Sequence, residues 1–141
     1  MPSFELPPHV DLTPDILQAV ADRHGRDTTA GVERLPDAGI VNAICYLGET
    51  AVLRVPRNHP GCIADCRAEV IAVPAALAAG VRTPRLLAFD ESLELIPVPY
   101  TVYERALGRS LEALRVAPDQ GAAVWREVGR DLARLHAGVP V

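Results

Sequence analysis

The sequence contains no lysine, and all 14 of its basic residues are arginine. Any contact that a protein normally gives to lysine must therefore be made here by arginine. The 18 acidic residues outnumber the arginines and give the 141-residue chain a formal net charge of −4. Because a general binder of nucleic acid or of an anionic membrane needs a positively charged surface, this balance argues against both classes.

Cysteine is also scarce. Cys45, Cys62 and Cys66 are the three cysteines, and so small and odd a set is not a disulfide framework. The spacing of His59, Cys62 and Cys66 loosely allows a metal site, but a fourth ligand is not evident. Reduced cysteines beside the start of a helix are the favoured interpretation.

Long apolar runs are missing as well. No segment approaches the roughly 20 apolar residues that a membrane-spanning helix needs. The N-terminal stretch MPSFELPPHV lacks the basic and apolar regions of a secretion signal. We therefore expect no membrane partner and a cytoplasmic location.

The chain does contain enough apolar material for a core, since 49% of its residues are hydrophobic, and its length fits one domain or one lobe. Thr13, Pro14 and Asp15 are typical of a helix start, and Gly25 is typical of its end. Residue patterns predict further helices over 63–79 and 120–137, and strands over 32–35, 43–47, 51–55, 85–89 and 99–104.

Short turns at 37–39 and 48–50 favour an antiparallel arrangement of the first three strands. Pro74 lies inside the predicted helix 63–79 and should kink it or split it in two. The segment 99–104 alternates like an edge strand or a half-buried strand. The expected fold class is α+β: a mostly antiparallel sheet of about five strands with one packed helix, preceded and followed by a helix.

Four stretches of sequence, read in order, point to a known family. They are GIVNAICYLG, AVLRVP, RAEVIAVPAAL followed by GVRTPRLLAFD, and PYTVYERALGRSL followed by VGRDLARLHA. Their order and spacing over 32–139 resemble the aminoglycoside phosphotransferase family, which has a protein-kinase-like fold and phosphorylates small alcohols. The resemblance implies an N-terminal helical segment at 1–30, a kinase-like small lobe with its hinge at 31–108, and the start of a second lobe at 109–141.

The resemblance assigns a phosphate-binding role to Arg54, on the third strand. The planar guanidinium binds phosphate oxygens in pairs and remains charged, so arginine suits this position. Glu69, on the helix that follows, matches the glutamate that orients the strand cation in kinase-like enzymes. The alternatives are an ordinary surface arginine and a solvated helix glutamate.

The same resemblance implies a nucleotide site for ATP around these two residues. The turn with Gly39 and Asn42 would cover the phosphates through its backbone N–H groups, although an ordinary hairpin turn is the alternative. The Glu104 carbonyl and the Ala106 N–H would bind adenine at the hinge. Tyr103 either packs near the base or belongs to the core.

The family's catalytic histidine, aspartate and asparagine, and its magnesium-binding aspartate, come after the helix 120–137. The sequence ends five residues after His136, which reads as a helix-end histidine near the C-terminal dipole. The expectation is therefore the ATP-binding half of a small-molecule phosphotransferase, which should be inactive by itself. Magnesium and a small-molecule acceptor are expected only with the missing lobe.

Two other functions stay open: a non-catalytic module that binds a nucleotide or a partner chain, and one chain of a split kinase. The helix 120–137 also carries an apolar face that should be exposed without a second lobe. We expect self-association, or docking of a second lobe, through that face. Its residues are Val124, Val128, Leu132 and Leu135, with Trp125 beside them as a core or interface residue.

Overall fold

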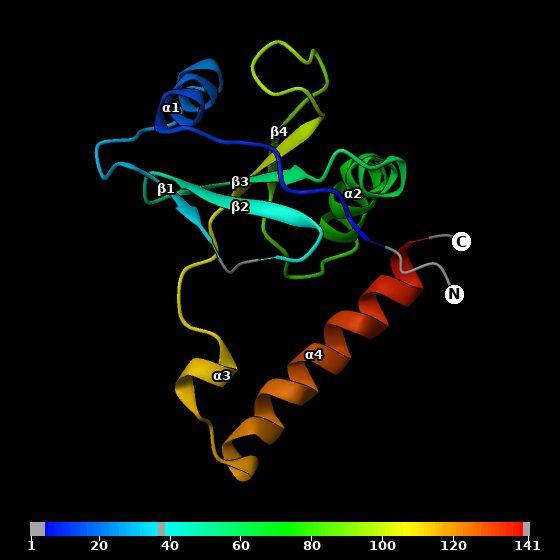
Figure 1. The fold of residues 1–141 in the computed structure, drawn as a ribbon. Helices are drawn as coiled ribbons and strands as arrows, with labels where there is room; N and C mark the ends of the chain where they lie inside the picture. Colours follow the sequence, from blue (N-terminus) through cyan, green and yellow to red (C-terminus); the bar gives the residue numbers. More distant parts are fainter. Residues whose placement is uncertain (1–4, 37–38, 140–141) are drawn as a thin grey trace.

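A computed structural model describes residues 5–36 and 39–139. Its strands form a single five-stranded sheet in the order β1-β2-β3-β5-β4, and all neighbouring pairs are antiparallel (Figure 1). This confirms the expected fold class. The strands are β1 (Val32–Leu35), β2 (Asn42–Leu47), β3 (Ala51–Pro56), β4 (Leu86–Asp90) and β5 (Tyr100–Glu104), and the helices are α1 (Pro14–Arg23), α2 (Pro60–Ala78), α3 (Leu111–Leu114) and α4 (Pro118–Gly138).

Helix α1 begins and ends where the capping residues predict. The Thr13 hydroxyl accepts a hydrogen bond from the Ile16 N–H at 3.3 Å, and proline occupies the first helical position. Past the last helical residue, Gly25 has a φ of +60°, a conformation that glycine adopts without steric cost.

The first face of the sheet holds the hydrophobic core. Leu53 and Val55 of β3 are fully buried on it, and α1 packs across it with Leu17 and Val20. Burial raises the pKa of the Cys45 thiol on this face to about 11. This thiol therefore stays protonated and packs as an apolar side chain. Figure 1 shows α1 on this side of the sheet and α3 and α4 on the other.

A polar cluster fastens α1 to the segment after β4. Arg23 donates to the Asp90 carboxylate at 2.9 Å and to the Glu94 carboxylate at 2.7 Å. The Tyr100 hydroxyl also donates to Asp90 at 2.9 Å, and its oxygen lies 3.0 Å from a ring nitrogen of His24. Because these contacts join residues far apart in the sequence, no local pattern predicts them.

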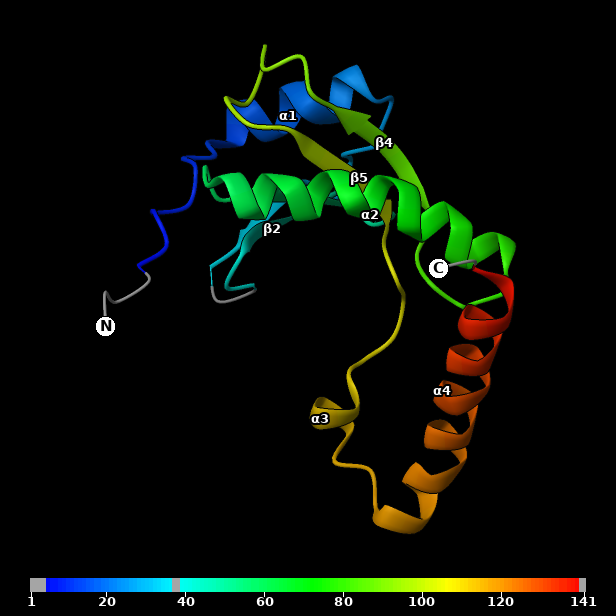
Figure 2. The same cartoon turned by 90° about the vertical axis from the view of Figure 1, so that its right-hand side faces the viewer.

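The second face of the sheet is only partly covered. Two rows of direct cross-strand neighbours lie on this face. One row is Ile44, Arg54 and Thr101, and the other is Tyr46, Val52 and Tyr103. Helix α2 packs against β3, β4 and β5 on this side (Figure 2). The remainder of this face is available for a binding site.

Helix α2 runs unbroken through Pro74, so the expected split does not occur, while the expected kink stays a prediction. Pro74 lies at an exposed position, where water can hydrogen-bond to the carbonyl that loses its partner within the helix. The expectation for the strand 99–104 was wrong. Strand β5 is not an edge or half-buried strand: it lies between β3 and β4 and is buried from Tyr100 to Tyr103. Both of its faces are covered, one by the core and the other by α2. The short helix α3 was not expected.

Helix α4 extends away from the sheet, and its C-terminal end returns to the end of α2, where Gly138 lies against Ala79 (Figure 2). Arg82, before β4, pairs with Glu127 of α4 at 3.0 Å and with Asp131 at 2.9 Å. Trp125 is 65% exposed, so its interpretation as a core residue was wrong, while its interface role stays a prediction. Among the described residues, no helix is both long and apolar enough to cross a membrane.

Candidate functional site

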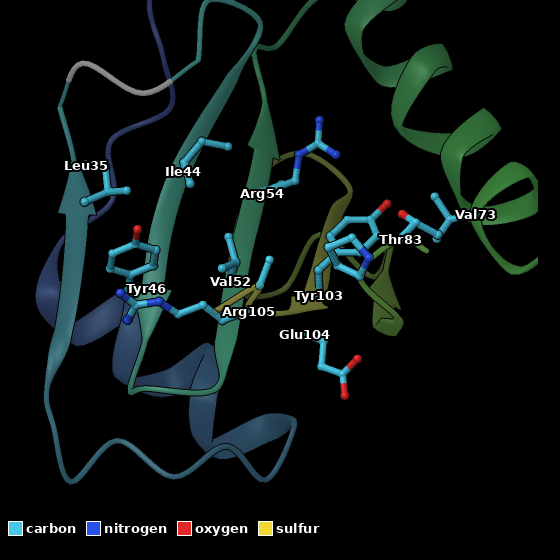
Figure 3. Close-up of a pocket in the computed structure, with 12 residues that line it drawn as sticks. Leu35, Ile44, Tyr46, Val52, Arg54, Val73, Thr83, Tyr103, Glu104 and Arg105 are labelled. Atoms are coloured by element: carbon cyan, nitrogen blue, oxygen red, sulfur yellow. The ribbon is translucent and has the colours of Figure 1, made fainter. Parts of the chain in front are cut away.

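A cavity of about 350 Å³ opens on the second face of the sheet (Figure 3). Three of the expected site residues, Arg54, Glu104 and Ala106, line it together. The sheet supplies one wall, and α2, the segment before β4 and the hinge after β5 supply the others. The lining residues are Leu35, Ile44, Tyr46, Val52, Arg54, Val73, Thr83, Pro84, Tyr103, Glu104, Arg105 and Ala106.

Arg54 and Glu69 form the ion pair that the sequence predicts. The two terminal guanidinium nitrogens of Arg54 donate to the two carboxylate oxygens of Glu69 at 2.7 and 3.2 Å. Both side chains are about one-third exposed. The paired geometry fixes the plane of the guanidinium and leaves its remaining N–H groups able to bind an anion.

Tyr103 is a third member of this pair that the sequence did not reveal. Its hydroxyl donates to the same Glu69 oxygen that accepts from Arg54, at 3.0 Å, and its ring centroid lies 5.5 Å from the Arg54 guanidinium carbon. Burial, followed by the charge of Glu69, raises the pKa of Tyr103 to about 12. The hydroxyl therefore remains a neutral donor at physiological pH.

The turn before β2 has a backbone that requires glycine. Gly39 has a φ of +89°, and a Cβ at this position would lie 2.4 Å from the Asn42 carbonyl oxygen. Arg57 holds the turn by donating from Nε to the Ile40 carbonyl at 2.7 Å. The rest of the predicted turn, Asp37 and Ala38, lies outside the described residues. Gly39 and Asn42 do not line the cavity, so their contact with phosphate stays a prediction.

The hinge is held by backbone hydrogen bonds on two sides. The Glu104 N–H donates to the Arg85 carbonyl at 2.8 Å, and the Arg105 N–H donates to the Thr50 carbonyl at 2.8 Å. The Arg105 guanidinium lies 3.6 Å from the ring centroid of Tyr46, a close cation–π contact (Figure 3). This contact was also missed, because it joins the hinge to β2 across the cavity.

The residues considered for a metal site do not form one. In the described part of the chain, no group of three or more His, Cys, Asp or Glu side chains is arranged to hold a metal ion. Cys62 and Cys66 are buried free thiols, and burial raises the pKa of Cys66. His59 instead caps α2 by accepting the Gly61 N–H at 3.1 Å.

The cavity thus combines an apolar slot with a cation, Arg54, that the Glu69 carboxylate orients. Ile44, Val52 and Tyr103 provide flat or branched apolar walls, and Arg54 provides N–H donors at one end. Such an arrangement suits a ligand with an aromatic ring and a negatively charged tail.

Two solved structures have a fold similar to that of this chain. The GDP complex of wild-type aminoglycoside 2'-phosphotransferase-IIIa has a TM-score of 0.57 at 19% identity, over 88% of this chain and 44% of that chain. The GDP and kanamycin complex of APH(2")-IIIa has a TM-score of 0.60 at 19% identity, over 92% of this chain and 46% of that chain. At such low identity these likenesses show a shared fold.

The chain spans less than half the length of those two solved structures. No curated protein matches it. However, the sequence model of the phosphotransferase enzyme family matches residues 33–140. This range contains the whole hinge and all five strands except the first residue of β1. The chain therefore belongs to the phosphotransferase enzyme family.

Proposed function

We propose that these 141 residues form the nucleotide-binding part of a small-molecule phosphotransferase. The observation that carries the proposal is that Arg54, paired with Glu69, lines the same cavity as the hinge at 104–106. The pair supplies an oriented charge for phosphate, and the hinge supplies backbone groups for a base.

The base of the nucleotide would occupy the apolar slot. Ile44 and Val52 of the sheet would pack against one side of the ring. The Glu104 carbonyl and the Ala106 N–H would exchange hydrogen bonds with its edge, as we expect from the sequence. ATP is the nucleotide that we propose. The two solved structures described above contain GDP, so GTP must be compared directly with ATP.

The phosphates would lie beside Arg54. Its guanidinium carries five N–H donors, of which Glu69 engages two, so further donors can reach phosphate oxygens. The turn with Gly39 and Asn42 would lie over the phosphates, and the conformation of Gly39 lets its backbone come close to neighbouring groups.

The acceptor and magnesium would bind mainly to a second lobe in a complete enzyme. Phosphoryl transfer requires a positioned acceptor and metal ions that neutralise the developing charge. Within the described residues, no acidic cluster suited to a metal ion is present. We therefore expect no phosphate transfer above background from these residues alone, and we propose only an alcohol of a small molecule as the acceptor class.

A second-lobe role for α4 is consistent with its surface. Its apolar side is uncovered: Val128 is 48% exposed and Leu132 is 51% exposed. Leu107 and Leu114, before α4, are also exposed. We propose that a second lobe covers these residues in a complete enzyme.

Nucleotide titration tests the proposed function. ATP and GTP are titrated into the wild type, the Arg54→Ala variant and the Arg67→Ala variant, with binding followed by calorimetry or ligand-observed NMR. Arg67 is the matched control because it lies on α2, pairs with the exposed Glu91 at 3.4 Å and does not line the cavity.

We expect Arg54→Ala to weaken triphosphate binding by about tenfold or more, because a charge-assisted contact is lost. Arg67→Ala should bind like the wild type. The proposal is wrong if the wild type binds neither nucleotide at millimolar concentration. It is also wrong if the two arginine variants lose the same affinity, because the cavity would then have no special role.

A further inference from the structure

The position of Tyr103 sets it apart from the tyrosine that belongs to the core. Tyr100, three residues earlier, is 1% exposed in the core cluster, and its hydroxyl contacts Asp90 beside α1. Tyr103 lies on the other face, lines the cavity, and contacts both members of the Arg54–Glu69 pair. Packing alone would be satisfied by phenylalanine, so the hydroxyl needs its own explanation.

The hydroxyl of Tyr103 constrains the Glu69 carboxylate from a second direction. One carboxylate oxygen of Glu69 accepts from Arg54 at 2.7 Å and from Tyr103 at 3.0 Å. Arginine and glutamate are long side chains that lose much rotational freedom when they pair, and a partly exposed pair alone contributes little free energy. Tyrosine has only two side-chain torsions, and Tyr103 is 6% exposed in a central strand.

The ring of Tyr103 constrains Arg54 in addition. The guanidinium carbon of Arg54 lies 5.5 Å from the ring centroid, within the range of a cation–π contact. Arg54 is therefore held by the carboxylate of Glu69 and by the ring of Tyr103, while the hydroxyl of that same tyrosine holds Glu69. The three side chains come from β3, α2 and β5, so each is fixed by a different element.

We propose that Tyr103 is a positioning residue: it fixes Glu69, and through Glu69 it aims the Arg54 guanidinium at the phosphates of a bound nucleotide. This inference rests on the function proposed above. Tyr103 makes no phosphate contact in this role. Its effect should therefore depend on the phosphate chain of the ligand and on the presence of the Glu69 carboxylate.

Two measurements separate this role from simple packing. The first compares ATP with adenosine in the wild type and in the Tyr103→Phe variant, which keeps the ring and removes the hydroxyl. We expect ATP affinity to fall about fivefold, the scale of a partly exposed hydrogen bond to a charged group, while adenosine affinity stays unchanged. GTP and guanosine replace this ligand pair if the titration above shows that GTP binds more tightly.

The second measurement repeats the substitution in a Glu69→Gln background. Tyr103→Phe should then have little further effect on ATP affinity, because the charged acceptor of its hydroxyl is already gone. Thermal unfolding of each variant verifies that the fold is kept. The Glu69→Gln variant by itself measures what the Arg54–Glu69 pair contributes to ATP affinity, so the role of Tyr103 is given by the difference between the effects of Tyr103→Phe in the two backgrounds.

Each outcome gives a decision. Equal losses for ATP and adenosine would mean that Tyr103 only shapes the cavity, and would overturn the inference. If Arg54→Ala weakens ATP binding but Tyr103→Phe does not, the proposed function stands and the positioning role fails. If the wild type binds no nucleotide, the proposed function fails, and the inference fails with it.

Discussion

The two sides of the sheet differ in how completely they are closed. On the α1 side, Leu53 and Val55 are fully buried, and the charged cluster around Asp90 joins α1 to the segment after β4. On the other side, alternate residues of the same strand, Val52 and Arg54, border an open cavity. Strand β3 thus contributes to the core with one set of side chains and to the wall of the cavity with the other.

Neighbouring residues of one strand can therefore lie in opposite environments without any change of local structure. Leu53 and Arg54 share one strand, but the alternation of side chains sends them to opposite sides. Substitutions on the α1 side should therefore change the free energy of unfolding. Substitutions on the cavity side should change ligand affinity and surface behaviour.

The largest effect is expected for Leu53→Ala. This change removes a fully buried side chain from the core and leaves a cavity, so it should lower the free energy of unfolding by about 2–5 kcal/mol. Arg54→Ala is the matched control on the next residue, where loss of a partly exposed ion pair should cost only about 0–1 kcal/mol.

Urea denaturation of both variants measures the difference. A destabilisation by Arg54→Ala as large as that by Leu53→Ala would show that the cavity side also supports the fold, and the division between the two sides would not hold.

An intermediate effect is expected for Asp90→Asn. Burial alone would raise the pKa of Asp90, but hydrogen bonds from Ser92, Arg23 and Tyr100 outweigh it and hold the pKa well below its usual value. Because the folded-state pKa is lowered, this stabilisation is present above the unfolded pKa of about 4 and is lost as the pH falls further.

We expect Asp90→Asn to lower the free energy of unfolding at pH 7 by about 1–3 kcal/mol, through loss of charge-assisted hydrogen bonds. The difference between wild type and variant should shrink as the pH falls below about 4. Glu94→Gln is the control, since Glu94 is 66% exposed and should contribute little. Denaturation curves from pH 7 to pH 3 test this, and a difference independent of pH would contradict it.

The smallest effect is expected at the apolar side of α4. Trp125 and Leu132 are 65% and 51% exposed, and uncovered apolar surface favours weak association between copies of the chain. Replacing both residues with glutamine should reduce concentration-dependent association while leaving the nucleotide affinity unchanged. Sedimentation velocity over a range of concentrations measures this. If the wild type remains monomeric at every concentration, the exposed apolar side of α4 does not require a covering partner.

Local patterns predicted most elements because their causes lie within a few residues. The Thr13 cap, the alternation in β3 and the position of Arg54 on that strand depend on neighbours in the sequence. The pairing of Arg54 with Glu69 was also predicted, but only through the family resemblance, since their separation of 15 residues has no local signature.

The remaining features depend on which elements become neighbours in space. Strand β5 is interior because the sheet order places it between β3 and β4, and this order brings Tyr103 to Arg54 and Glu69. The contact between Arg23 and Asp90 spans 67 positions of the sequence. Periodicity and capping report only local preferences, whereas such contacts form when the whole sheet and its helices pack together. The positioning of the candidate phosphate ligand is therefore a property of the tertiary structure.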